Sequence, residues 1–98
     1  MTTLKEKSKL TSKMSLEEAV TSIKTGKQCK AFLDVILSPN EAKSIRKRWE
    51  IFKFMTDGAT QKRISEVVDV APATVSRARR TFDSGKAEAV LKSVLGQK

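Results

Sequence analysis

The segment of residues 60–82, TQKRISEVVDVAPATVSRARRTF, restricts the possible fold more than any other part of the chain. Ile64 and Val68 have the spacing of the buried face of one helix. Val75 and Ala78 have the spacing of a second buried helical face, and only a few residues separate the two patterns. Two short helices joined by so short a turn form a helix-turn-helix, which we predict for this segment.

The residues around the turn fit the geometry of this motif. Thr60 can cap the first helix, and Ser65 is small enough for the place where the two helices approach most closely. Asp69 occupies the turn position that needs a left-handed backbone, which aspartate tolerates better than most residues other than glycine. Val70 then fills the inside of the turn, and Pro72 presets the backbone of the first residue in the second helix.

The outward face of the second helix is small and hydroxylic at its start and basic at its end. Ala73, Thr74 and Ser76 would let the helix approach base edges closely in a DNA groove, and Ala73 would contact a thymine methyl. Arg77 would bind a guanine edge or a phosphate, with Arg80 one turn further along. The structural alternative is an αα-hairpin that carries arginines without binding DNA.

The start of the first helix is a second predicted contact with DNA. Thr60, Gln61 and Lys62 lie at its N-terminus, where free backbone N–H groups and the helix dipole favour a phosphate. The predicted DNA-binding residues are therefore Thr60, Gln61, Lys62, Pro72, Ala73, Thr74, Ser76, Arg77 and Arg80.

The charge of the chain favours a polyanionic partner. Its 98 residues include 20 Lys and Arg but only 11 Asp and Glu, which gives a net charge of +9. Nucleic acid and an anionic membrane surface both fit this excess. The basic residues are spread over several predicted elements rather than opposite one apolar stripe, so we expect double-stranded DNA as the partner and no membrane.

The residue types that are missing exclude most catalytic chemistry. The chain has no histidine, no tyrosine and a single cysteine, Cys29. It therefore offers no histidine-assisted nucleophile, no internal disulfide and no histidine-ligated or cysteine-cluster metal site, and we expect no enzymatic activity. The longest apolar stretch, Ala31 to Leu37, is too short to cross a bilayer. We expect a cytoplasmic protein associated with a bacterial-type nucleoid.

Apolar residues before the motif also repeat at helical spacing. Ser15-Leu16-Glu17-Glu18 has the form of a capping box and predicts a helix that ends at Gly26. Pro39 opens the longest predicted helix, which runs to Asp57 and stops at Gly58. Between these two helices a further one has its buried stripe on Cys29, Ala31, Phe32, Leu33, Val35, Ile36 and Leu37.

The long helix has an unusually broad apolar face. Such a face would suit either the core of a dimer or the central helix of a monomer. Its residues are Ala42, Ile45, Trp49, Phe52 and Met55, with Ile51 and Phe54 beside them.

The last predicted helix completes an all-α fold with about six helices. Asp83 or Ser84 would cap this helix, and Gly96 would end it. Residues 1–14 are predicted to be a flexible basic arm, because they contain too few apolar residues to order them. Residues 15–98 are predicted to form one all-helical DNA-binding domain.

Three segments resemble parts of a known family. They are Leu37-Ser38-Pro39-Asn40-Glu41, Lys47-Arg48-Trp49-Glu50-Ile51 and Ala73-Thr74-Val75-Ser76-Arg77. The family is that of the tryptophan repressor, with its Leu-Thr-Pro-Asp-Glu helix start, a basic residue followed by a long apolar helix, and an Ala-Thr-Ile-Thr-Arg recognition segment. The resemblance covers residues 16 to about 82. It implies an intertwined all-helical homodimer that presents two recognition helices to a roughly palindromic operator.

The resemblance also implies a ligand site. Family members that sense tryptophan hold its indole between two arginines that match Arg48 and Arg77, and Ser38 and Thr74 match further positions of the pocket. Those members continue with Gly-Ser-Asn, whereas this chain has Ala78-Arg79-Arg80. We expect no required cofactor, with L-tryptophan or another small-molecule co-repressor as the implied ligand. The alternative for Arg48 is a solvated or ion-paired arginine on the helix surface.

These observations predict a sequence-specific DNA-binding transcriptional regulator, and the resemblance implies a repressor. The alternative is the DNA-recognition subunit of a transposition or replication complex, because such subunits share the helix-turn-helix. Stable association with a larger nuclease or ATPase subunit would favour that alternative.

Overall fold

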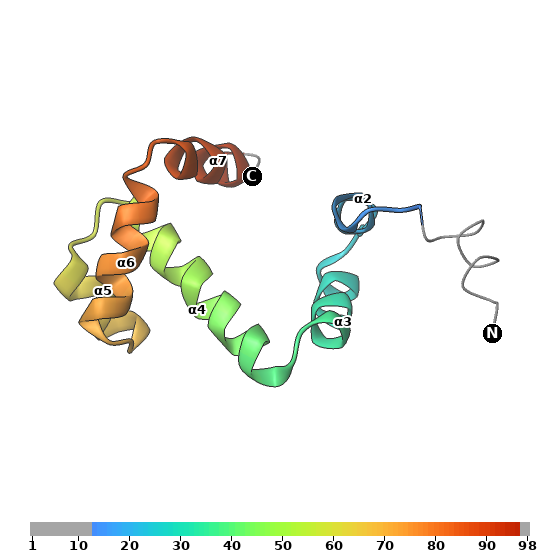
Figure 1. Ribbon diagram of the computed structural model, residues 1–98, viewed down its shortest axis with the longest axis horizontal. Coiled ribbons are helices and arrows are strands. Elements are labelled where there is room, and N and C mark those ends of the chain that lie inside the picture. Colours follow the sequence, from blue (N-terminus) through green and yellow to red (C-terminus); the bar gives the residue numbers. More distant parts are fainter. Residues whose placement is uncertain (1–12, 97–98) are drawn as a thin grey trace. The chain divides into compact units, whose positions relative to one another are not determined.

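The computed structural model describes residues 13–96, and this range forms six helices, labelled α2 to α7 in Figure 1. They are α2 (Leu16–Thr21), α3 (Gly26–Ile36), α4 (Pro39–Thr56), α5 (Gln61–Val68), α6 (Pro72–Phe82) and α7 (Lys86–Leu95). The predicted all-α fold class with about six helices is confirmed. Within the described range, no helix is both long and apolar enough to cross a membrane.

Contacts divide the chain into two units, Met1–Pro39 and Asn40–Lys98. Most of the predicted basic arm, residues 1–12, lies outside the described residues. The expected division into an arm of residues 1–14 and one domain of residues 15–98 stays a prediction.

The first helix begins as predicted but ends earlier. The Ser15 hydroxyl accepts from the backbone N–H of Glu18 at 3.0 Å, and the Glu18 carboxylate accepts from the backbone N–H of Ser15 at 2.8 Å. This reciprocal pair is the predicted capping box. The helix ends at Thr21 rather than at Gly26, because the Ser22 hydroxyl donates to a carbonyl of the last turn and satisfies the helix end there.

The next helix starts where the first was predicted to stop. The Thr25 hydroxyl accepts from the backbone N–H of Gln28 at 3.0 Å, which makes Gly26 the first residue of α3. The predicted buried stripe of this helix is only partly covered. Val35 is 83% exposed and Ile36 is 54% exposed, so apolar surface on α3 remains uncovered in the single chain.

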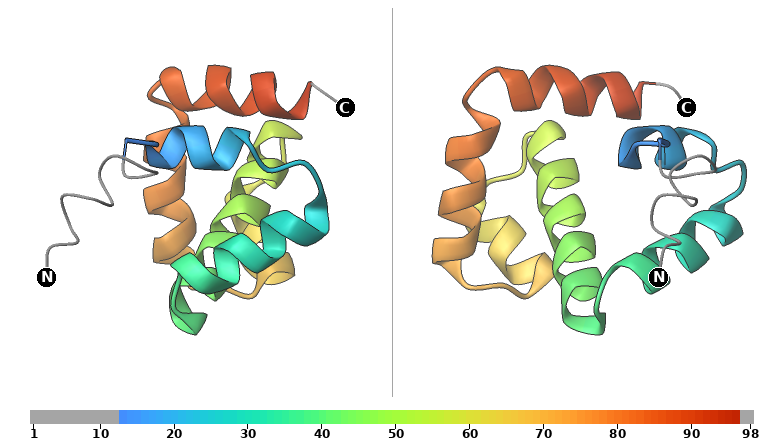
Figure 2. Two further views of the ribbon diagram at one scale, coloured as in Figure 1. Left: turned by 90° about the vertical axis from the view of Figure 1, so that its right-hand side faces the viewer. Right: turned by 45° about the vertical axis from the view of Figure 1, so that its right-hand side comes forward.

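The core of the second unit joins α4, α5 and α6, which Figure 2 shows in two views. The rings of Phe52 in α4 and Phe82 in α6 stack with their centroids 6.5 Å apart. Leu91 of α7 packs against the same core. The buried residues of this cluster are Ile51, Met55, Ile64, Val75 and Phe82.

The apolar face of α4 is only partly as predicted, because Ala42 and Met55 are buried and Phe52 packs against the core, but two other members of the face are exposed. Ile51 and Met55 are buried against the helix-turn-helix, whereas Ile45 is 46% exposed and Trp49 is 37% exposed. The apolar pattern is wide enough to cover two sides of the helix, and the core of this unit uses only the side that contains Ile51. The side that contains Trp49 is open to solvent in the single chain.

The start of α7 also differs from the prediction. Neither Asp83 nor Ser84 caps this helix, because Asp83 ends α6 and pairs there with Arg79 at 3.7 Å. The N-cap is Gly85, with a φ of 90° and no side-chain hydrogen bond. Glycine adopts this backbone without steric cost, and the chain can therefore turn sharply between α6 and α7. The predicted end at Gly96 is confirmed.

Candidate nucleic-acid interface

The first helix of the motif begins with the predicted cap. The Thr60 hydroxyl accepts from the backbone N–H of Arg63 at 3.1 Å, and α5 starts at Gln61. Ile64 is fully buried and Val68 is half-buried against the core, as their spacing predicted. The cap and the buried Ile64 therefore hold the start of α5 in place, while the side chains of Gln61 and Lys62 are exposed to solvent.

The turn between α5 and α6 has the predicted backbone. Asp69 has φ 63° and ψ 59°, the left-handed conformation, and Val70 packs against the core. The Ser65 hydroxyl donates to the carbonyl of Val70 at 2.6 Å. Ser65 is therefore not only small enough for the place where α5 and α6 approach each other, because its hydrogen bond also joins the end of α5 to the turn. Lys47 of α4 donates to the carbonyl of Asp69 at 3.3 Å and ties the turn to the long helix.

The left-handed residue provides a test of the turn. We expect Asp69→Gly to raise the free energy of unfolding by up to about 1 kcal/mol, because glycine has no Cβ to strain this backbone. Asp69→Val should lower it by about 1–2 kcal/mol, because a branched side chain tolerates this conformation poorly. Urea unfolding of the two variants measures both changes. Destabilisation by Gly as large as that by Val would show that the turn depends on the Asp69 side chain.

The second helix of the motif divides into the predicted inward and outward faces. Pro72 is its first residue, Val75 is fully buried, and Ala78 packs against the core. The outward positions are exposed, namely Ala73, Thr74, Ser76, Arg77 and Arg80. The division into faces is confirmed, whereas contact of the outward face with DNA stays a prediction.

Four of the predicted DNA-binding residues line one groove between α5 and α6, with a volume of about 460 Å³. They are Gln61, Lys62, Pro72 and Ser76, and Ser65 and Glu66 complete the lining. The Ser76 hydroxyl donates to the side-chain oxygen of Gln61 at 3.3 Å, which links the two helices at their exposed surface. Glu66 was not predicted here, and its negative charge would oppose a phosphate beside Lys62.

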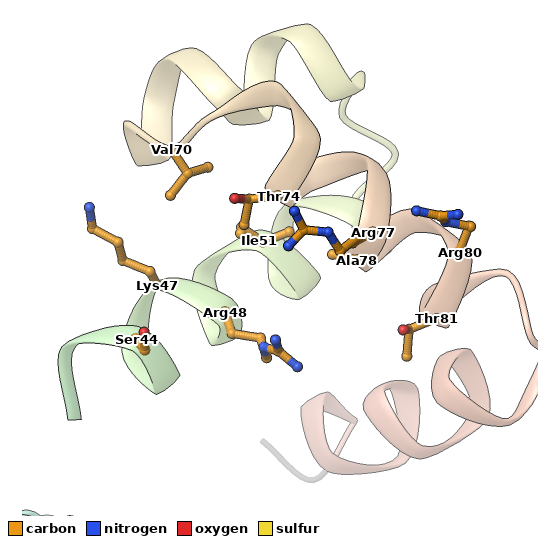
Figure 3. A pocket seen from close by; sticks show the side chains of 10 residues that line it. All are labelled: Ser44, Lys47, Arg48, Ile51, Val70, Thr74, Arg77, Ala78, Arg80 and Thr81. Carbon is orange, nitrogen blue, oxygen red and sulfur yellow. The ribbon is translucent and has the colours of Figure 1, made fainter. Parts of the chain in front are cut away.

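Three further predicted residues line a second hollow, a cleft of about 560 Å³ between α4 and α6. They are Thr74, Arg77 and Arg80, and Arg48 of α4 faces them (Figure 3). The cleft thus brings together three of the four predicted ligand-binding residues, Arg48, Thr74 and Arg77. The fourth, Ser38, belongs to the other unit. Thr60 and Ala73 line neither hollow.

The sequence interpretation did not predict the rest of this lining. The additional residues are Ser44, Lys47, Ile51, Val70, Ala78 and Thr81. Part of this lining could have been predicted from the sequence of α4. Ser44 lies three to four residues before Lys47 and Arg48, and Ile51 lies three to four residues after them, which places all four on one face of the helix. For metals, residues 13–96 contain no group of three His, Cys, Asp or Glu side chains that could hold an ion.

Comparisons with known proteins agree with this geometry. The model of the family described as Trp repressor protein matches residues 11–97 of the chain. This match is longer than the predicted resemblance, which covered residues 16 to about 82. The "Uncharacterized protein YerC" of Bacillus subtilis (strain 168) is 29% identical over 70 residues, which is 71% of this chain and 67% of that protein. No solved structure matches the chain.

Proposed function

The chain belongs to the Trp repressor protein family, a family of DNA-binding regulators, and we therefore propose that it represses transcription by occupying a specific operator. One observation carries this proposal. The inward side chains of α5 and α6 are packed in the core, and the two helices contact each other. The start of α5 and the outward face of α6 are exposed to solvent, and the side chains on the face of α6 are small at its start and basic at its end. This is the arrangement that a recognition helix needs in a major groove.

The proposal includes a homodimer with two recognition helices. Its support is apolar surface that the single chain leaves uncovered on several helices. The exposed apolar side chains include Leu16 and Val20 of α2, Val35 and Ile36 of α3, Ile45 and Trp49 of α4, and Val90 and Val94 of α7. A two-fold pair would set the recognition helices about 34 Å apart, to match successive major grooves of a palindromic operator.

We propose that operator binding requires no cofactor and that the regulator has no catalytic role. It would act in the cytoplasm, where it reaches the nucleoid. A small molecule, L-tryptophan or another, would modulate binding from the cleft that Arg48 and Arg77 line. Ala78 and Arg80 in this cleft differ from the residues of tryptophan-sensing members and argue for another ligand.

The test of this function is selection of genomic DNA fragments by the purified protein, followed by footprinting of the best site. We expect a protected palindrome whose half-sites lie one helical turn apart. Sedimentation of the complex would give its stoichiometry, expected to be two chains per site. Uniform binding to all fragments would show that the basic charge acts alone, and one chain per unsymmetrical site would contradict the dimer.

Replacement of Arg77 tests whether the protein binds its operator more tightly than unrelated DNA through this residue. We expect Arg77→Ala to weaken operator binding by about 1–3 kcal/mol, because one bidentate contact with a base edge is lost. Lys5→Ala removes the same charge outside the motif and should cost far less, equally on operator and unrelated DNA. Electrophoretic mobility shifts on both DNAs measure the difference. Equal losses for the two variants would mean that the helix-turn-helix does not read the sequence.

A further inference from the structure

Positive charge dominates the lining of the cleft between α4 and α6. Lys47 and Arg48 contribute to it from α4, and Arg77 and Arg80 from α6, whereas no acidic residue of the described range 13–96 lines it. Figure 3 shows Arg48 and Arg77 reaching in from the two different helices. The cleft therefore concentrates four cationic side chains around one volume of about 560 Å³.

The arginines of the cleft are not neutralised by any carboxylate that the structure describes. Within residues 13–96, no carboxylate forms an ion pair with Arg48, Arg77 or Arg80. Arg79 lies in the same helix outside the cleft, and its charge is paired with Asp83 at 3.7 Å. Three guanidinium groups thus remain available to a ligand, and each can bind a carboxylate or phosphate through two parallel hydrogen bonds.

The other lining residues suit the remaining parts of a small anion. Hydroxyl groups of Ser44, Thr74 and Thr81 can donate further hydrogen bonds to its oxygens. Apolar atoms of Ile51, Val70 and Ala78 can contact a carbon skeleton. The four cationic side chains outnumber the single carboxylate of an amino acid, so a ligand with more than one negative charge matches this lining better.

We propose that this cleft binds a small molecule with at least two negative charges, of the phosphorylated or dicarboxylic class, and that this ligand weakens operator binding. The inference rests on the proposed function, because Arg77 and Arg80 are also predicted DNA contacts. An anion that occupies these two arginines removes them from the DNA phosphates, and by reciprocity the operator weakens binding of the anion. The expected effect is opposite to that of a co-repressor.

The phosphates of DNA are also anions that arginines bind. Replacement of Arg48 can distinguish a small anion in the cleft from the phosphates of bound DNA. Arg48 lines the cleft from α4 and is not among the predicted DNA contacts. A small anion held between α4 and α6 needs Arg48, whereas an operator held by α5 and α6 does not. Arg63 is the matched control, because it is an exposed arginine of α5 that lines neither hollow.

Binding is measured first without DNA, by calorimetric titration of the purified full chain with pyrophosphate at constant ionic strength. We expect saturable binding that Arg48→Ala weakens by about tenfold or more, the loss of one charge-assisted contact. Arg63→Ala should leave it within about twofold. Circular dichroism checks that both variants are folded. Absence of pyrophosphate binding would overturn the proposal, as would saturable binding of L-tryptophan in its place.

The effect of the anion on operator binding is measured next, with the operator found by footprinting. At constant ionic strength, saturating pyrophosphate should weaken operator binding by about fivefold or more, and Arg48→Ala should abolish this effect while leaving operator affinity without pyrophosphate nearly unchanged. Loss of operator affinity in Arg48→Ala as large as in Arg77→Ala would overturn the proposal and assign the cleft to DNA phosphates. Arg48-dependent pyrophosphate binding by a protein that selects no DNA site would support the anion site and overturn the proposed function alone.

Discussion

Operator affinity is expected to fall by about 10³–10⁵-fold between 50 and 200 mM salt, the range for a protein that contacts 6–10 phosphates. The physical reason is the release of counterions from DNA when lysine and arginine side chains neutralise its phosphates. Such contacts come from the net charge of +9 on each chain and from Arg77 and Arg80 of α6, which form no ion pair within residues 13–96.

The measurement is a plot of the logarithm of the dissociation constant against the logarithm of salt concentration. Arg80→Ala should reduce the slope of this plot by about one for each Arg80 side chain that contacts a phosphate in the complex. Affinity that is nearly independent of salt would contradict binding through the basic face of α6, whichever residues read the bases.

The second large effect concerns the core below the motif. Ile64→Ala should lower the free energy of unfolding by about 2–5 kcal/mol, because Ile64 is fully buried between α4 and α6 and its removal leaves a cavity. A domain of this size has about 5–15 kcal/mol of stability in total. The expected loss is therefore a large part of the total stability.

Val67→Ala is the matched control, because Val67 belongs to the same helix and is 47% exposed. Its replacement should change the free energy of unfolding by about 0.5 kcal/mol or less. Urea unfolding at one fixed protein concentration measures both variants, since dimer formation would make stability depend on concentration. Similar losses in the two variants would contradict the inward direction of Ile64.

The helix-turn-helix could be predicted from the sequence because its constraints are local. The cap at Thr60, the left-handed residue Asp69 and the proline at the start of α6 each depend on a few neighbouring residues. Once these are fixed, helical spacing alone decides that Val75 is inside and Arg77 outside.

Features that depend on distant parts of the chain could not be predicted in the same way. The apolar pattern of α4 allowed two sides to be buried, and the packing of α5 and α6 selects the side of Ile51 over that of Trp49. Gly26 and Gly85 were missed for a local reason, because they lie at the starts of α3 and α7, although glycine near a helix boundary more often ends a helix. Helical spacing could place Ser44 and Lys47 on one face of α4, but it could not show that this face lies beside Thr81 of α6.

Arg79 has a consequence for how the basic residues of α6 are counted. Its guanidinium lies over the ring of Phe82, 5.7 Å from the centroid, and it also pairs with Asp83. This arginine has an acidic partner in its own helix end, so of the three arginines in α6 only Arg77 and Arg80 have no ion-pair partner among the described residues. Asp83→Asn would release the third charge and make the protein bind all DNA more tightly, at the expense of its ability to discriminate between sites.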